Sequence, residues 1–285
     1  MSGLKTVLLL GALSGLLVGL GYIIGGPSVA IFALVLAGVM NFIAYWFSDK
    51  LALRMAGAHE VSREQEPHLH ALVEEVATLA GVPKPKVYIV QNESPNAFAT
   101  GRDPNHAVVA VTTGIMRILD RRELRAVIGH EIGHVRNRDI LISSIAATIA
   151  GAISYLQTML LWGAMFSGGR DRNGGNVLIA FLASVVAAFA AVILQMAISR
   201  TREFAADKSG AEYVHDPEAL ASALAKLHNG VQVRPLPQTA GTEATSSLYI
   251  VHPFRMEGGL SSLFSTHPPV EERIRRLRRM AGYVE

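Results

Sequence analysis

The chain has 285 residues, 50% of them hydrophobic and only 17% charged, with a formal net charge of +3 and no cysteine. The charges are unevenly spread, because residues 6–48, 140–169 and 173–199 contain no Asp, Glu, Lys or Arg. About a quarter of the remaining residues are charged, as in an average soluble domain. The low mean therefore combines a membrane part with a soluble part, and it excludes a disordered chain, a fibrous chain and a plain soluble enzyme. The lack of cysteine excludes a disulfide scaffold and any thiolate metal site.

The first uncharged stretch is about twice as long as the roughly 20 apolar residues that a spanning helix needs. Gly25-Gly26-Pro27 interrupts it, which predicts a hairpin of two membrane helices over residues 6–24 and 28–47. The second helix ends in Tyr45, Trp46 and Phe47, which are typical of a membrane interface. The alternative for the first helix is a cleaved signal peptide, which the closely following second apolar run disfavours.

The other two uncharged stretches predict a second hairpin. Residues 140–166 and 176–198 are long enough to span and are rich in Ala, Ser and Gly, which suits close helix packing in a bilayer. The alternative is a pair of buried helices in a large soluble core. The sequence therefore predicts an α-helical membrane protein with about four transmembrane helices in two hairpins.

The soluble residues predict an α+β domain. Leu69 to Leu79 follow helical spacing up to Gly81, and residues 86–90 and 106–111 are β-rich runs, joined by a loop, that predict a small β-sheet. Asp120 and Glu123 form the signature of a capping box that opens a helix to about residue 138.

Two further helices are expected after the last apolar run. One begins at Asp216-Pro217 and ends at Asn229-Gly230, residues 231–262 resemble a loop, and a final helix follows Pro268-Pro269. The four arginines toward the end of that final helix favour a solvated face over specific lipid binding.

The most specific motif is His130-Glu131-Ile132-Gly133-His134 on the capped helix. Histidines four residues apart lie on one helix face, so both imidazoles can bind one Zn²⁺. Glu131 projects beside them, where it can take a proton from zinc-bound water. The alternative is an amphipathic helix whose histidines face solvent.

A catalytic zinc usually has three protein ligands, and the third decides the enzyme class. The metzincin pattern requires Gly at 137 and His at 140, but Asn137 and Ile140 stand there, so that class is excluded. Glu203 is a candidate, and Asp207, one helical turn on, could hydrogen-bond a ligand histidine. The spacing leaves alternatives open: Glu203 could pair with a neighbouring arginine, and the competing ligands are Asp139, His106 and His267.

The sequence resembles the HtpX group of membrane zinc endopeptidases, gluzincins related to the CAAX-prenyl endopeptidases. The resemblance lies in the helix motif, in Glu203-Phe-Ala-Ala-Asp207 and in Phe264-Ser-Thr-His-Pro-Pro269 with the following Glu-Glu-Arg-Ile. Asn96-Ala-Phe-Ala-Thr-Gly101 is similar too. The resemblance implies a zincin-like fold, one Zn²⁺ held by His130, His134 and Glu203, Glu131 as the catalytic base and Asp207 behind the ligands.

The resemblance also implies a role in membrane protein quality control and the stress response. It points to the bacterial inner membrane, an active site facing the cytoplasm, and misfolded or damaged membrane proteins as substrates. The chain would divide into a first hairpin (1–49), a catalytic segment (50–139), a second hairpin (140–199) and a second catalytic segment (200–285). The distribution of basic residues agrees with a cytoplasmic site, since seven flank the spans on the domain side and two lie opposite: Lys5, Lys50, Arg54, Arg136, Arg138, Arg200 and Arg202 against Arg170 and Arg172.

Two further roles complete the expected mechanism. His267 is a candidate donor to the oxyanion, beside the alternative of a structural cap. The strand containing Val108, Val109, Ala110 and Val111 is a candidate to bind an extended substrate by β-augmentation. No nucleic-acid partner is expected, because no basic run is interleaved with aromatic residues.

The residues disfavour three rival functions. An intramembrane protease is disfavoured because the arginines around the histidine motif are too costly at membrane depth. A CAAX-prenyl endopeptidase resembles a longer chain with more spans. An inactive membrane scaffold or metal-binding regulator would have no need of Glu131.

Overall fold

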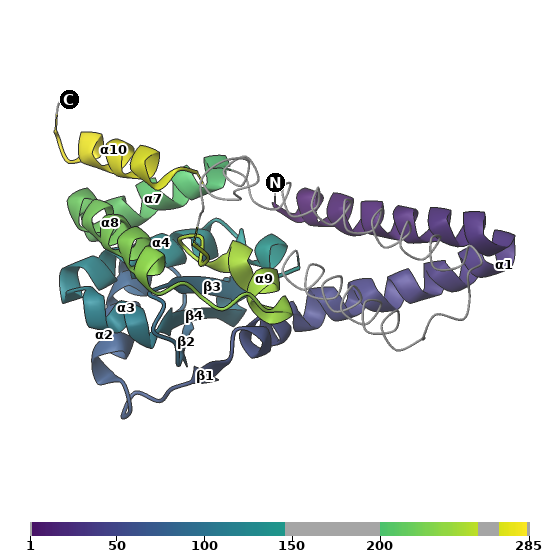
Figure 1. The fold of residues 1–285 in the computed structure, drawn as a ribbon, viewed down its shortest axis with the longest axis horizontal. Coiled ribbons are helices and arrows are strands. Elements are labelled where there is room, and N and C mark those ends of the chain that lie inside the picture. The colour runs from purple at the N-terminus through teal and green to yellow at the C-terminus, as the bar shows by residue number, and fades with distance from the viewer. Residues whose placement is uncertain (1, 146–199, 256–267, 284–285) are drawn as a thin grey trace.

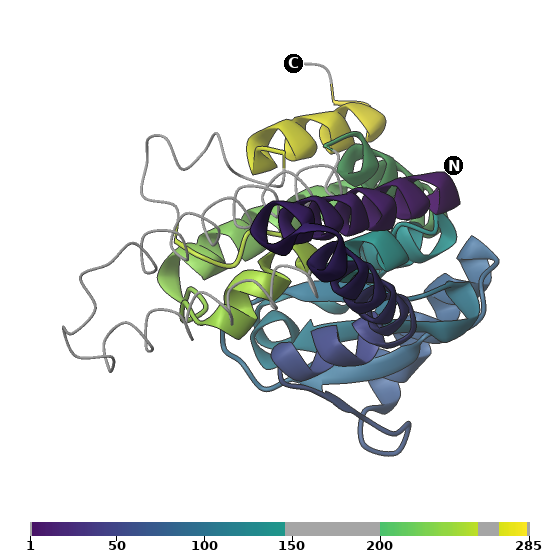
Figure 2. The same cartoon turned by 90° about the vertical axis from the view of Figure 1, so that its right-hand side faces the viewer.

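The computed structural model describes residues 2–145, 200–255 and 268–283. Within these ranges a four-stranded sheet and its covering helices form one body, and a long helical hairpin extends away from it (Figure 1). Figure 2 views the molecule from the end of this hairpin. Residues 140–145 of the predicted second hairpin are helical, and the rest of it lies outside the described residues.

Helix α1 (Ser2–Met55) doubles back on itself, so the predicted reversal of the chain within residues 6–47 is present (Figure 1). The reversal lies at Gly26, whose φ of +65° is a conformation that glycine adopts without the steric cost of a Cβ. The two halves of α1 are in contact, since Asn41 Nδ2 donates to Ser14 Oγ at 2.8 Å. The first half of α1 thus binds the amide nitrogen of Asn41, whereas Asn41 Oδ1 is buried without a hydrogen-bond partner among the described residues.

Among the described residues, one segment, Gly26–Met55, is long and apolar enough to cross a membrane by its length and composition. It presents large apolar side chains outward, for example Ile31 and Phe32, which are 64% and 68% exposed. The predicted total of four spanning helices is not confirmed, because residues 146–199 lie outside the described part of the chain.

The last turns of α1 pack into the body. Ala52 and Leu53 belong to one buried cluster with Phe98 and Val108 of the sheet and with Tyr249. The helical hairpin and the body therefore share a continuous helix and an apolar core, with no linker between them.

The sheet has the strand order β1-β2-β4-β3. Strand β2 (Lys86–Val90) pairs in parallel with β4 (Ala107–Thr112), which confirms the two predicted strands. Strands β1 (Ala58–Glu60) and β3 (Ala97–Gly101) lie at the two edges, each antiparallel to its neighbour. The expectation of a loop over residues 97–101 was wrong, because these residues form an edge strand.

Helix α4 (Arg121–Arg136) lies at the centre of the body, in contact with α2 (Pro67–Ala80), α7 (Arg200–Val214), α8 (Pro217–Val233) and strand β3. Its residues 126–133 are all buried, and apart from His130 and Glu131 they are apolar or small, which explains the central position of the helix. The short helix α3 (Thr113–Ile118) joins β4 to α4, and α10 (Val270–Met280) packs on α7 and α8.

Some of the helix and loop boundaries predicted for the second half of the chain were wrong. Helix α8 continues to Val233, beyond the predicted stop at Asn229-Gly230. The expected loop over 231–262 contains the short helix α9 (Ala240–Thr245) and a 3₁₀ turn, η2 (Ser246–Leu248). Another 3₁₀ turn, η1 (Pro104–His106), leads into β4. Thr239 caps α9 with a capping box whose N3 residue is Thr242 in place of the usual Glu or Gln, which weakens the sequence signal.

Candidate active site

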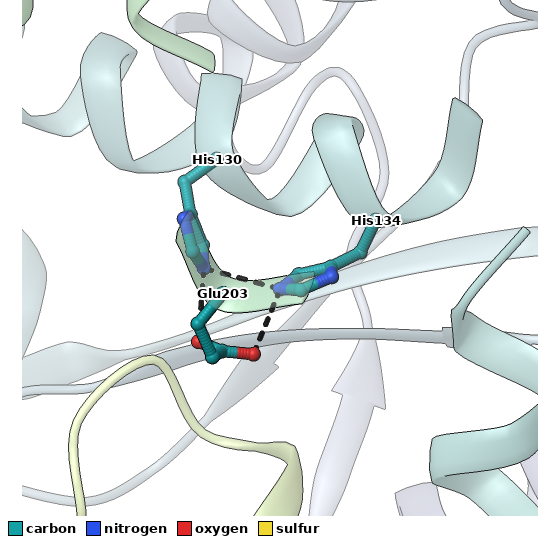
Figure 3. Close-up of side chains that lie close together, drawn as sticks. All are labelled: His130, His134 and Glu203. Carbon is teal, nitrogen blue, oxygen red and sulfur yellow. Dashed lines mark hydrogen bonds and ion pairs between the residues drawn. The ribbon is translucent and has the colours of Figure 1, made fainter. Parts of the chain in front are cut away.

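The capping box at Asp120 starts the helix that carries the histidine motif. Asp120 Oδ1 accepts from the Glu123 amide at 2.8 Å, and Glu123 Oε2 accepts from the Asp120 amide at 3.0 Å. From this start the helix runs unbroken through His130 and His134, which therefore point in one direction with their Nε2 atoms 3.2 Å apart (Figure 3).

Glycines at the crossing of α4 and α7 allow the two helices to approach closely. A Cβ on Gly210 of α7 would lie 2.5 Å from the His130 backbone nitrogen, and a Cβ on Gly129 would lie 2.9 Å from the Gly210 carbonyl oxygen. Neither distance is compatible with a side chain. The absence of side chains at this crossing therefore decides how near the residues of α7 come to the histidines.

Glu203, in the first turn of α7, completes a cluster of three donors with the two histidines (Figure 3). Its Oε1 lies 3.4 Å from His134 Nε2, and its Oε2 lies 3.8 Å from His130 Nε2. Ligands about 2.0–2.1 Å from a tetrahedral zinc are about 3.3 Å from one another. The three donors thus fit the edges of such a site.

Carboxylates face the other nitrogen of each imidazole. His130 Nδ1 lies 2.9 Å from Asp207 Oδ1, and His134 Nδ1 lies 3.7 Å from Asp139 Oδ2. A carboxylate at Nδ1 holds a proton there and leaves Nε2 with a lone pair for a metal. Asp207 thus lies where the resemblance implies, and Asp139, a rival ligand on the sequence, faces a histidine from the side opposite the cluster.

The two histidines have opposite electrostatic environments. Burial lowers the pKa of His130 to about 4, although Asp207 opposes the shift, so this ring is neutral at pH 7. Burial also disfavours the charged form of His134, but Glu203, Asp139 and Glu131 raise its pKa to about 9. Such an excess of negative charge around one imidazole is the environment that attracts a cation.

Glu131 is a buried carboxyl group next to this cluster. It is 1% exposed, and its Oε1 has no hydrogen-bond partner among the described residues. Burial raises its pKa to about 7; His134 opposes the shift, Glu203 adds to it, and the backbone of Ala99 in β3 lowers the pKa. A buried carboxylate oxygen without a partner is costly unless a further group, such as a water molecule, binds it.

Arg273 is a residue of the site that the sequence analysis missed. It is completely buried, and it donates to Asp207 through Nε at 2.8 Å and through Nη2 at 2.7 Å. Its Nη1 donates to the Ile250 carbonyl at 2.7 Å and lies 3.8 Å from Glu203 Oε2. One signal was available: Arg273 stands on the face of α10 that also carries the buried Leu277, where an exposed charge is not expected.

The structure separates other candidates from the cluster. His106 is half exposed and pairs with Asp103 at 2.9 Å, outside the cluster of three donors. His267 lies outside the described residues.

The assignment of Val108, Val109, Ala110 and Val111 as the substrate-pairing strand was wrong. These residues belong to β4, whose two edges are already paired with β2 and β3. A central strand has no free backbone donors and acceptors to offer a peptide. The sequence alone does not show this, because it predicts a loop at residues 97–101, which form the strand paired with β4.

A helix with two histidines, a glutamate on the crossing helix and a buried carboxylate beside them define a metalloprotease. The family model "Peptidase family M48" matches residues 62–281, and the chain belongs to this family. "Protease HtpX homolog" of Persephonella marina is 53% identical over 283 residues, covering 99% of this chain and 98% of the relative. The protein with the same name in Pyrococcus furiosus is 51% identical over 278 residues, with coverages of 97% and 95%.

A solved structure is also similar. The crystal structure of S. mikatae Ste24p matches with a TM-score of 0.52 and 16% identity, over 97% of this chain. Because the identity is only 16%, the likeness concerns the fold alone, and this chain spans 65% of the length of that structure.

Proposed function

We propose that this chain is an integral-membrane, zinc-dependent endopeptidase of misfolded or damaged membrane proteins. The observation that carries the proposal is the joint position of three donors, His130, His134 and Glu203, with the buried Glu131 beside them. Their mutual distances of 3.2 to 3.8 Å suit one tetrahedral ion better than a network of ordinary ion pairs.

His130, His134 and Glu203 would hold the zinc. Zinc supplies acidification of a bound water and polarisation of the scissile carbonyl. Asp207 and Asp139 keep the imidazoles oriented through Nδ1, and Arg273 keeps Asp207 ionised and in place.

Glu131 has the role of general base in this proposal. Its buried oxygen without a partner is the acceptor for the proton of the attacking water, and the same carboxyl then donates a proton to the leaving amine. His267 stays our candidate for the additional donor to the oxyanion.

The substrate would bind in extended form at β3, the edge strand beside α4. On the outer side of β3, Ala97 accepts from the Ile250 amide at 3.0 Å, and no further backbone hydrogen bond from described residues reaches the strand there. The Ala99 backbone hydrogen-bonds Glu131, and the outer edge beyond this contact would offer its backbone groups to a substrate close to that carboxyl group. Backbone pairing tolerates many sequences, as degradation of damaged proteins requires.

The membrane location and topology are part of the proposal. The apolar surface of Gly26–Met55 supports insertion, and the seven-to-two distribution of basic residues supports a site on the cytoplasmic side of a bacterial inner membrane. We also propose that the chain divides into four parts after residues 49, 139 and 199 and that both hairpins span the membrane. A role in membrane protein quality control and the stress response is part of the same proposal.

The test is Glu131→Gln in detergent-purified protein, with zinc content and casein cleavage measured on the same sample. The proposal expects zinc to be retained and cleavage to be lost, because Glu131 does not touch the metal. The competing function of an inactive scaffold predicts no cleavage by the wild type. Cleavage that survives Glu131→Gln contradicts the proposed mechanism.

A further inference from the structure

We propose that the first hairpin holds the active site at a short, fixed distance from the membrane, so that the enzyme cuts its substrates within a few residues of the bilayer surface. This inference rests on the proposed function and adds a rule for substrate selection. It is built from contacts between α1 and β3, the strand that borders the active site.

The aromatic residues near the end of the apolar surface mark the membrane interface. Tyr45, Trp46 and Phe47 are 39–44% exposed, and the first charged residues of the helix after Lys5 follow at Asp49 and Lys50. Lys50 Nζ lies 5.6 Å from the centre of the Phe47 ring. Aromatic rings with an adjacent lysine are typical of the headgroup level of a bilayer.

The end of β3 reaches this same level. Arg102, the residue directly after the strand, stacks its guanidinium over the Trp46 ring at 4.8 Å from the ring centre. His106 Nε2, 2.7 Å from Arg102 Nη2, and Asp103, 3.4 Å from Nε, hold the guanidinium in place. The turn after β3 therefore lies at the membrane interface.

The position of β3 relative to the hairpin is rigid. Ala52 and Leu53, one to two turns beyond Trp46, share a buried cluster with Phe98 of β3. Thr100 of β3 is also hydrogen-bonded to Ser144, at the start of the second apolar run, through their hydroxyl oxygens 2.6 Å apart. Because the strand is fastened to both membrane segments, the active site cannot swing away from the bilayer as it could on a flexible tether.

The distance along the strand is short. The backbone of Ala99 faces Glu131, and Arg102 lies three positions further along the chain, which is about 10 Å of extended chain. A substrate lying along β3 has the same rise per residue. Its scissile bond would therefore lie about three to six residues beyond the interfacial end of a membrane helix.

The experiment uses full-length protein in lipid vesicles with a single-span substrate. The substrate carries an unstructured tail of about 40 residues, about 130 Å when extended, in which one cleavable sequence repeats. The tail faces the active site, and mass spectrometry locates each cut. We expect the cuts to fall mainly in the repeat nearest the membrane. Cuts spread evenly along the tail, or equal rates on the same tail without its membrane helix, would overturn the inference.

The proposed function is tested separately by casein cleavage in the same preparation, with Glu131→Gln as the inactive reference. If the wild type does not cleave casein, the proposed function is refuted. If it cleaves casein but cuts the tail evenly along its length, only the inference of a fixed distance from the membrane is refuted. The double variant Trp46→Ala, Arg102→Ala is expected to widen the distribution of cuts along the tail. The matched control is Arg63→Ala, an exposed arginine paired with Glu74 in the body, which leaves the distribution unchanged. An unwidened distribution in the double variant contradicts the proposal.

Discussion

Arg273 and Asp207 form a bidentate ion pair in which Nε and Nη2 of the arginine donate at 2.8 and 2.7 Å, and both side chains are buried. Asp207 Oδ1 also lies 2.9 Å from His130 Nδ1, so the pair connects the C-terminal helix α10 to the histidine helix α4. The pKa of Asp207 is about 2: burial raises it, but Arg273 and His130 outweigh that effect. The carboxylate thus stays charged next to the imidazole that it orients.

Arg273→Ala should weaken zinc binding and destabilise the fold. Removing one partner of a buried ion pair leaves the other charge uncompensated, at a cost of about 3–5 kcal/mol. Loss of the support behind a histidine ligand typically costs about 10–100-fold in metal affinity. Arg273→Lys keeps the positive charge but cannot make the two parallel hydrogen bonds to Asp207. Its zinc affinity should therefore fall between those of Arg273→Ala and the wild type. Zinc competition with a chromophoric chelator measures the affinity. Arg275→Ala, an exposed arginine of the same helix, is the control, and wild-type affinity in Arg273→Ala contradicts the role given to this residue.

Glu203→Gln should lower the zinc affinity more than a substitution of Asp207, Asp139 or Arg273, which surround the ligands. The amide removes the charged oxygens that lie 3.4 and 3.8 Å from the two imidazoles. We expect a loss greater than the roughly 100-fold upper range for residues around the ligands. The matched control is Glu212→Gln, a carboxylate of the same helix that is 56% exposed and pairs with Lys208. Equal zinc content in the two variants under limiting zinc would exclude Glu203 as a ligand.

Gly210→Ala should move Glu203 on α7 away from the two histidines on α4. The added Cβ would lie 2.5 Å from the His130 nitrogen, so α7 has to move away from α4 and carry Glu203 with it. Overpacking of this kind costs about 1–3 kcal/mol. We expect a lower thermal midpoint together with weaker zinc binding. Gly38→Ala, at a helical position with nothing within 4 Å, is the control. A variant that keeps both properties would show that the close helix crossing is not required.

Glu123 should make a pH-dependent contribution to stability. Burial opposes its charge, but hydrogen bonds from Lys226, Ser222 and the Asp120 amide hold the pKa of this carboxyl below its usual 4.5. Because the folded-state pKa is the lower one, the contribution is fully present above the unfolded pKa and disappears as pH falls through the folded pKa. Glu123→Gln should therefore cost about 1–3 kcal/mol at neutral pH, and less at an acidic pH well below the usual pKa of 4.5. Urea unfolding at both pH values measures this difference, and a cost that does not shrink on acidification contradicts it.

Local patterns in the sequence predicted the elements that are specified by their own residues. Helix α4 was predicted from its capping box, α2 from its apolar spacing and Gly81, and β2 and β4 from short apolar runs. Strand β3 was missed because Ala97-Phe-Ala-Thr-Gly101 is buried throughout and shows no alternation. Its pairing with β4 decides its conformation, and this pairing is a tertiary contact.

Composition alone identified the unequal distribution of charge, and residue spacing alone identified the histidine motif. Both were accessible because hydropathy and helical periodicity depend on a few neighbouring residues. They determined a membrane part, a soluble part and a helix with two metal-binding side chains. Only the tertiary structure decided that Glu203 meets these histidines, that Arg273 is buried against Asp207, and that β3 rather than β4 lies at the edge of the sheet. The physical reason is that these relationships join residues 66 or more positions apart, or depend on which strand is left unpaired, and no local propensity encodes either.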